Sequence, residues 1–153
     1  MPLPSDQMPA LMMKWTLGDE DAARFLLNCA ALARLADDIA DGDKGPDRVA
    51  AMGEVLVRAM VVNAANPFFI ANREALAPVL AEAAGWWVTS ERWRRHESRN
   101  TRMFAFVWRE GTASIAHTVA YLIGGWEHML AVMEDLHALA DRDGETFEEW
   151  EAS

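Results

Sequence analysis

The chain has 153 residues, enough to bury about two-thirds of its unfolded surface as one domain, which we place over residues 1–153. Hydrophobic residues make up 52% and charged residues 25%, as in soluble globular proteins, and the net charge of −10 disfavours a general binder of nucleic acids or anionic membranes. The single cysteine, Cys29, excludes an internal disulfide and fits a reducing compartment.

Residues 1–18 make a poor signal peptide, because one early lysine and two prolines precede the apolar stretch. No apolar stretch reaches the roughly 18 residues that a membrane helix needs. We therefore expect a cytoplasmic protein with no membrane span. We also expect residues 1–18, like the acidic tail 143–153, to be peripheral or loosely ordered.

Helical periodicity runs through the rest of the chain, strand-like alternation is absent, and glycine and proline fall at the edges of the periodic runs. Asp19 is a predicted N-cap, and Gly42 can end the helix that follows it. The predicted helices cover residues 19–41, 46–64, 72–97, 101–123 and 126–142. The sequence therefore predicts an all-α fold, a compact bundle of four to five main helices.

Three aspartates, Asp37, Asp38 and Asp41, end the first of these helices. The residues of this helix are apolar on nearly every side, so we expect the helix to be central and mostly buried. Carboxylates brought together in such a place need a counter-charge, and their i, i+3 and i+4 spacing suits Mg²⁺. The alternative is a solvated turn, in which Arg34 pairs with Asp38.

The run "ALARLADDIADGD" resembles the first aspartate-rich motif of the squalene/phytoene synthase family, which belongs to the class I isoprenoid synthases. The matching residues are Arg34, Asp37, Asp38, Ile39 and Asp41. The resemblance implies a reduced isoprenoid-synthase-like fold in which the three aspartates hold Mg²⁺ against the diphosphate of a prenyl substrate. The chain is shorter than family enzymes and shows no second acidic motif of the family's spacing. The resemblance therefore implies a prenyl-diphosphate-binding protein with or without turnover, as a prenyl transferase or a diphosphate lyase-like enzyme.

An arginine-rich segment, "SERWRRHESRNTRMFAFVWRE", contains six of the twelve arginines. The forked guanidinium suits bidentate binding of phosphate, so this segment could complete a diphosphate clamp. The predicted diphosphate ligands are Arg34, Arg95, Arg99 and Arg102. The alternative is that these arginines pair with acids on neighbouring helices or on a partner subunit.

Histidines and tryptophans supply the remaining candidates. Glu134 and His137 form one Glu-x-x-His pattern, the repeating unit of carboxylate-bridged di-metal bundles, but a second copy is absent. The seven tryptophans predict a core and a subunit interface, with the lining of a prenyl cavity as the alternative. We therefore expect a homo-oligomer.

Two functions from different classes follow. One is an Mg²⁺-dependent protein that binds a prenyl diphosphate at Asp37, Asp38 and Asp41. The other is a non-catalytic, oligomeric helical protein whose role is interaction or structure and whose acidic helix end is only solvated.

Overall fold

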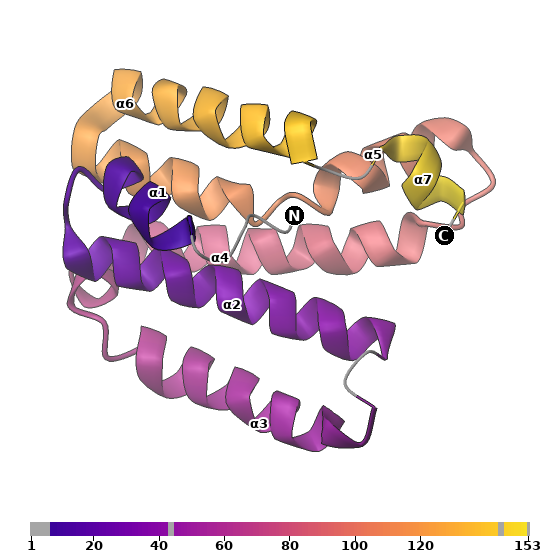
Figure 1. Cartoon of the computed structure of the whole chain (residues 1–153), viewed down its shortest axis with the longest axis horizontal. Coiled ribbons are helices and arrows are strands. Elements are labelled where there is room, and N and C mark those ends of the chain that lie inside the picture. Colours follow the sequence, from indigo (N-terminus) through magenta and orange to yellow (C-terminus); the bar gives the residue numbers. More distant parts are fainter. Residues whose placement is uncertain (1–6, 43–44, 144–145, 153) are drawn as a thin grey trace. The chain divides into compact units, whose positions relative to one another are not determined.

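The structure is a computed structural model that describes residues 7–42, 45–143 and 146–152 (Figure 1). Every regular element within these ranges is a helix, which confirms the predicted all-α class. The contacts divide the chain into two compact units: an N-terminal unit, Pro9–Arg73, and a C-terminal unit, Glu74–Ser153 with Met1–Met8. Helix α4 (Pro67–Trp93) contributes to both units, and the single domain placed over residues 1–153 stays a prediction.

The division between the units falls beside an interruption of α4. Asn72 has φ −117° and ψ 18°, outside the helical range, and its side-chain amide donates to the Phe68 carbonyl at 2.9 Å. A side chain that takes a carbonyl of the preceding turn competes with the helical backbone pattern. The predicted helix 72–97 therefore begins earlier than expected, at Pro67, with Asn72 as a kink inside it.

The N-terminal unit is built around α2 (Glu20–Asp41), which confirms the predicted helix 19–41. The Asp19 side chain accepts a hydrogen bond from the Ala22 amide at 2.9 Å, and Gly42 takes the left-handed conformation with φ 82°. Phe25, fully buried on α2, stacks on Phe69 of the first turn of α4 with ring centres 5.6 Å apart. The other elements of the unit are α1 (Met8–Trp15), η1 (Gly45–Asp47), α3 (Arg48–Val57) and η2 (Arg58–Asn63).

A buried polar network ties η2, a turn of π-helix, to α2. The Asn28 amide donates to the Asn63 side-chain oxygen at 2.8 Å and to the Arg58 carbonyl at 3.2 Å. Arg58 in turn donates to the Asn28 side-chain oxygen at 3.0 Å, and Asn63 donates to the Cys29 sulfur at 3.6 Å. The network thus satisfies amides that would be costly to bury alone. Burial raises the pKa of the Cys29 thiol to about 12, so the thiol stays protonated.

The C-terminal unit contains the rest of α4 and three further helices: α5 (Arg99–Trp108), α6 (Ala113–Asp143) and α7 (Phe147–Ala152). The predicted helix 101–123 is wrong at residues 109–112, where a turn separates α5 from α6. Gly111 in this turn packs closely against Trp86, because a Cβ there would lie 2.5 Å from the Trp86 ring. Trp93 and Trp108 also stack, with ring centres 5.0 Å apart, so this end of α4 packs on α5.

Helix α6 is bent into a hairpin whose two halves lie side by side (Figure 1). Gly125 has φ 75° and ψ −166°, a conformation essentially restricted to glycine. A Cβ on the preceding Gly124 would lie 2.6 Å from the His128 side chain. The sequence predicts a helix break at these two glycines, and the structure confirms it.

Two of the helices fall in the described parts of the segments expected to be loose, 7–18 and 146–152. Within them, α1 buries Met12 and Trp15, and α7 buries Trp150 with 1% of its surface exposed. Thr146 and Glu149 cap α7 reciprocally: the Thr146 amide donates to the Glu149 carboxylate at 2.8 Å, and the Glu149 amide donates to the Thr146 hydroxyl at 3.3 Å.

Across the described residues, no single helix is long and apolar enough to cross a membrane. One pair of helices reaches that length and apolarity only when both are counted together: Arg48–Asn63 and Pro67–Trp93, which are bent by 102° at their junction.

Replacing Gly125 by alanine is expected to destabilise the protein by about 2 kcal/mol, because alanine cannot adopt this backbone conformation without strain. Gly85→Ala is the matched control. It lies in α4 with open space around its Cβ position, so it should be neutral or stabilise by about 1 kcal/mol or less. Urea unfolding of both variants measures the difference, and an equal effect of the two would contradict the role of Gly125.

Candidate functional site

The three aspartates lie at the C-terminal end of α2, where the helix is only partly buried. Asp37 and Asp41 are exposed, and Asp38 is half-buried and has an interaction partner of its own. The expectation of a helix buried along its length holds only for the first half, because beyond Cys29 the only buried position of α2 is Ile39. The last turn of α2 contains no basic residue.

The aspartates do not belong to a cluster of protein metal ligands. The described ranges contain no group of three or more His, Cys, Asp and Glu side chains arranged to hold a metal ion. The three aspartates therefore follow one another along the end of α2 without forming such a group. A cation held there would take much of its coordination from water or from a bound anion, as Mg²⁺ commonly does.

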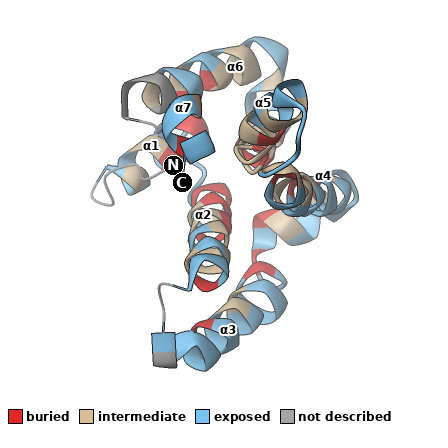
Figure 2. Cartoon of the chain, turned by 90° about the vertical axis from the view of Figure 1, so that its right-hand side faces the viewer, coloured by how far each residue is buried: buried red, intermediate tan, exposed pale blue. Residues whose placement is uncertain are grey.

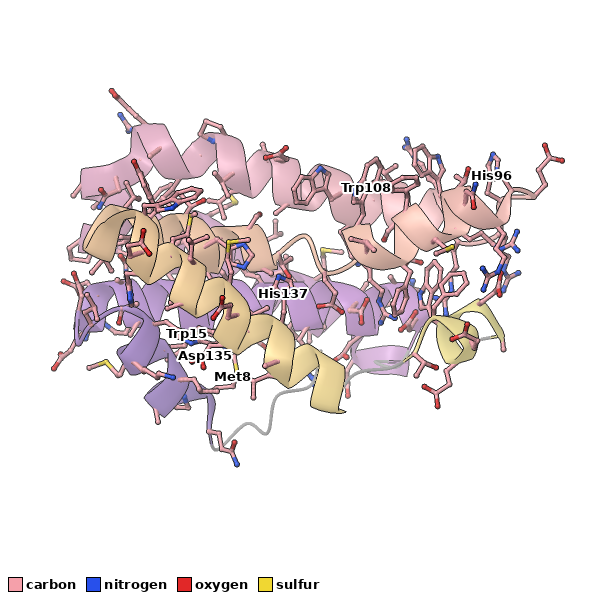
Figure 3. All side chains as sticks on the ribbon, turned by 90° about the horizontal axis from the view of Figure 1, so that it is seen from above. Met8, Trp15, His96, Trp108, Asp135 and His137 are labelled. Atoms are coloured by element: carbon pink, nitrogen blue, oxygen red, sulfur yellow. The ribbon has the colours of Figure 1, made fainter. Side chains whose placement is uncertain are left out.

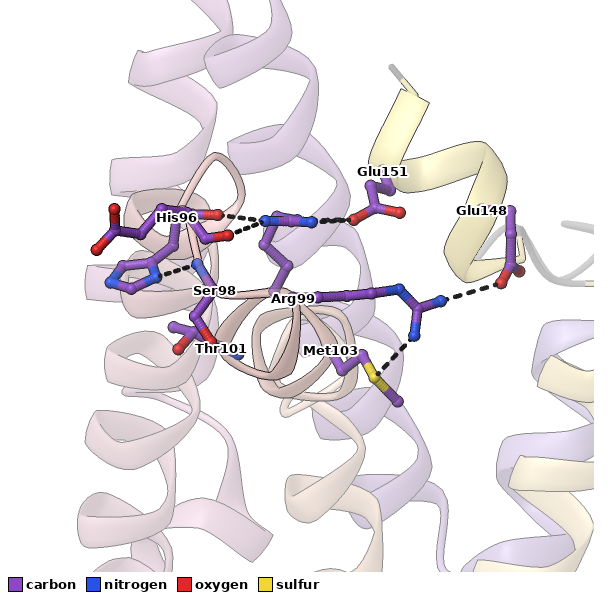
Figure 4. A network of polar contacts seen from close by, with 9 residues as sticks. His96, Ser98, Arg99, Thr101, Met103, Glu148 and Glu151 are labelled. Carbon is purple, nitrogen blue, oxygen red and sulfur yellow. Dashed lines mark hydrogen bonds and ion pairs between the residues drawn. The ribbon is translucent and has the colours of Figure 1, made fainter.

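The predicted diphosphate-binding arginines fall into both units. Arg34 is an exposed residue of the N-terminal unit, and Arg95 is an exposed residue of the C-terminal unit. Arg99 lies 3.6 Å from the Glu148 carboxylate, and Arg102 binds the Glu151 carboxylate through two nitrogens, each at 2.7 Å (Figure 4).

Arg102 is held further by the turn that precedes α5. It donates to the carbonyls of His96 and Glu97, the latter at 2.9 Å, so its donors are shared between this turn and α7 (Figure 4). The alternative drawn from the sequence, pairing with acids on a neighbouring helix, is thus what Arg99 and Arg102 do.

The same arginine-rich segment surrounds the aromatic side chains of α7. Trp150 lies 5.5 Å from the Phe106 ring, with Arg94 at 5.4 Å and Arg109 at 5.9 Å from its ring centre. Arg99 lies 5.1 Å from the ring of Phe147. These distances are typical of cation–π contacts, so the segment anchors α7 by stacking as well as by ion pairs. The sequence shows these residues, but it does not show that they face one another.

Two histidines face each other across the α6 hairpin. His117 comes from the first half, and His137 belongs to the second half (Figure 3), with ring centres 5.6 Å apart. The Nε2 atom of His117 is shielded from solvent and has no hydrogen-bond partner among the described residues. Burial, followed by the charge of His137, lowers the pKa of His117 from its ordinary value of 6.5.

An exposed apolar face runs along α3 and η2. We call it the α3 face, and it consists of Val49, Met52, Leu56, Val57 and Met60. Figure 2 shows α3 mostly in the colour of exposed residues. Val49 is 84% exposed and Met60 is 71% exposed, although the opposite side of the same segment buries Ala51 and Asn63. The sequence predicts a helix over residues 46–64, but the exposure of its apolar residues was not predicted.

Comparisons with protein-family models, with curated proteins and with solved structures find no match for this chain. The resemblance of residues 30–42 to the squalene/phytoene synthase motif therefore stays a prediction.

The stability of the protein is expected to fall as the pH decreases through about 6.5, the pKa of histidine in the unfolded chain. The lowered pKa of His117 means that the unfolded chain binds this proton more readily than the folded protein does. Neutral His117 therefore makes its full contribution to the free energy of unfolding above the pKa of the unfolded chain, and this contribution is lost as the pH falls and histidine binds a proton.

Melting temperatures between about pH 7.5 and 5.5 test this prediction, because carboxylates contribute little there. His117→Gln should flatten the profile, whereas His96→Gln, at an exposed position, should leave the slope unchanged. A profile for His117→Gln as steep as that of the natural protein would show that another group is responsible.

Proposed function

We propose that the protein is a non-catalytic helical interaction protein that assembles with a second copy of itself through the α3 face. The observation that carries the proposal is that α3 is apolar on two sides while the chain covers only one of them. A helix that is apolar nearly all round is stable in water when both sides are buried. A second copy would supply the missing cover.

The size of the exposed surface supports self-assembly. Val61, Val62 and Ile70, which are each about half exposed or more, add to the five residues of the α3 face. Monomeric proteins usually expose apolar residues singly, so eight of them within residues 49–70 mark an interaction surface. A stable dimer buries about 800 Å² on each subunit, and eight side chains of this size can supply much of that area.

Charge also favours a second copy over a membrane surface. The segment carries two arginines, Arg48 and Arg58, and one glutamate, Glu54, which pairs with Arg58 at 2.7 Å, so its excess of positive charge is a single residue. Helices that lie on membranes usually carry lysine and arginine on the polar side, and the net charge of −10 would oppose binding to anionic lipids. An uncharged face can meet its own copy about a twofold axis without bringing like charges together.

A second candidate function is the binding of Mg²⁺ with a diphosphate at the end of α2. The observation that favours it is the exposure of Asp37 and Asp41 at the negative end of the helix dipole, in a last turn without a basic residue. Carboxylates placed there oppose the dipole, and a bound cation would relieve that repulsion. Arg34, also exposed, is the nearest predicted diphosphate ligand along the same helix.

The natural protein is expected to sediment as a dimer, at twice its chain mass of 17.1 kDa, at micromolar concentrations. Met60→Glu places a charge in the α3 face and should raise the dimer dissociation constant at least tenfold, because the charge would lose water on association. Sedimentation velocity over a range of concentrations measures this.

The control for this experiment is Val107→Glu, which adds the same charge at an exposed apolar position of α5 and should leave the dimer intact. A natural protein that stays monomeric at 100 µM would overturn the proposal. Co-sedimentation of that monomer with vesicles of neutral phosphatidylcholine would assign the α3 face to membranes instead.

For the second candidate, Mg²⁺ with inorganic pyrophosphate should raise the melting temperature by several degrees once the ligand is well above its dissociation constant. Asp37→Asn should abolish the rise, whereas Asp47→Asn, an exposed position outside the motif, should preserve it. Equal responses of the two variants, or no response of the natural protein, would exclude the site.

A further inference from the structure

We propose that His117 and His137 form a two-histidine site for a divalent transition metal ion, which would clamp the two halves of the α6 hairpin. The site is independent of the α3 face and of the aspartates of α2. Its protein ligands are two imidazoles, and water completes the coordination. Zn²⁺, Ni²⁺ and Cu²⁺ are the ions that imidazole ligands favour.

The ring geometry fits this class of ion. A zinc–nitrogen distance of about 2.1 Å and a tetrahedral angle place the centres of two coordinating imidazoles about 5 Å apart. The observed separation of the His117 and His137 ring centres is 5.6 Å, with 51° between the ring planes. The observed separation is therefore close to that of two imidazoles bound to one ion.

The state of His117 also suits a ligand. Its Nε2 atom is shielded from solvent without a hydrogen-bond partner among the described residues, and a buried nitrogen of this kind is costly unless something binds it. Metal ions bind the neutral imidazole, and the surroundings of His117 favour that form. His137 is exposed, so an ion and its water ligands can approach from solvent.

The position of the two histidines in the fold means that a bound ion would hold the two halves of α6 together. The two histidines are separated by the turn at Gly124–Gly125, so an ion bound to both would close a loop of the chain. Closing a loop in the folded state opposes separation of the two halves of α6. Glu134, on the turn before His137, is exposed and does not complete a three-ligand group within the described residues.

The experiment is a thermal-shift titration of the untagged full chain with NiCl2 and ZnCl2, read by circular dichroism. The melting temperature should rise by several degrees when the ion is about 100 times its dissociation constant, and EDTA should reverse the rise. MgCl2 should give no rise through this pair, because Mg²⁺ prefers oxygen ligands. A response to Mg²⁺ would concern the aspartates and not the histidines.

His137→Ala should weaken Ni²⁺ binding at least tenfold, and since His137 is exposed the variant should fold normally. His96→Ala is the control, because it removes an exposed histidine from the turn before α5 and should leave binding unchanged. Three results would overturn the site: no rise with the natural protein, undiminished binding by His137→Ala, or an equal loss in His96→Ala.

Discussion

Two buried amides, Asn28 and Asn63, determine how the N-terminal unit presents its surface. The Asn28 amide donates to the Asn63 side-chain oxygen at 2.8 Å and so joins α2 to η2, and Arg58 donates to the side-chain oxygen of Asn28. A buried polar pair allows one register, since any slip of η2 along α2 would leave amides without partners. The side of α3 that faces α2 is therefore fixed, and so is the side left outward. The α3 face thus depends on a polar contact on the opposite side of the same segment.

The arginine-rich segment shows how a cluster with an apparent ligand-binding composition can act inside the chain. Arg99 and Arg102 pair with carboxylates of α7, and Arg94 and Arg109 lie against the Trp150 ring. The guanidinium group combines a flat face with forked donors, so it can bind an aromatic ring and a carboxylate in one place. Helix α7 has only six residues, too few to be stable in isolation, and these contacts hold it.

Local signals in the sequence located α2 and the bend of α6, but not every helix boundary and not how the helices pack. Asp19, Gly42 and the Gly124–Gly125 pair act through their own backbone, so the ends of α2 and the bend of α6 could be predicted. The turn after Trp108 was not predicted, and the close packing of its Gly111 against Trp86, a residue 25 positions away, has no local signal. The pairing of His117 with His137 and the exposure of Val49 and Met60 are likewise tertiary properties. The sequence shows which residues are apolar or titratable, whereas burial and proximity depend on how the helices pack.

The burial of Cys29 makes the chain its own reporter of unfolding. Thiol reagents attack the thiolate, and a pKa of about 12 leaves very little of it at neutral pH. Cys29 is also the only cysteine in the sequence, so any modification has one origin. The rate at which a thiol reagent modifies the native protein would therefore measure how often α2 and η2 separate, as hydrogen exchange does for amides. Any bound ligand that stabilises the N-terminal unit would therefore slow the modification of Cys29 by the thiol reagent.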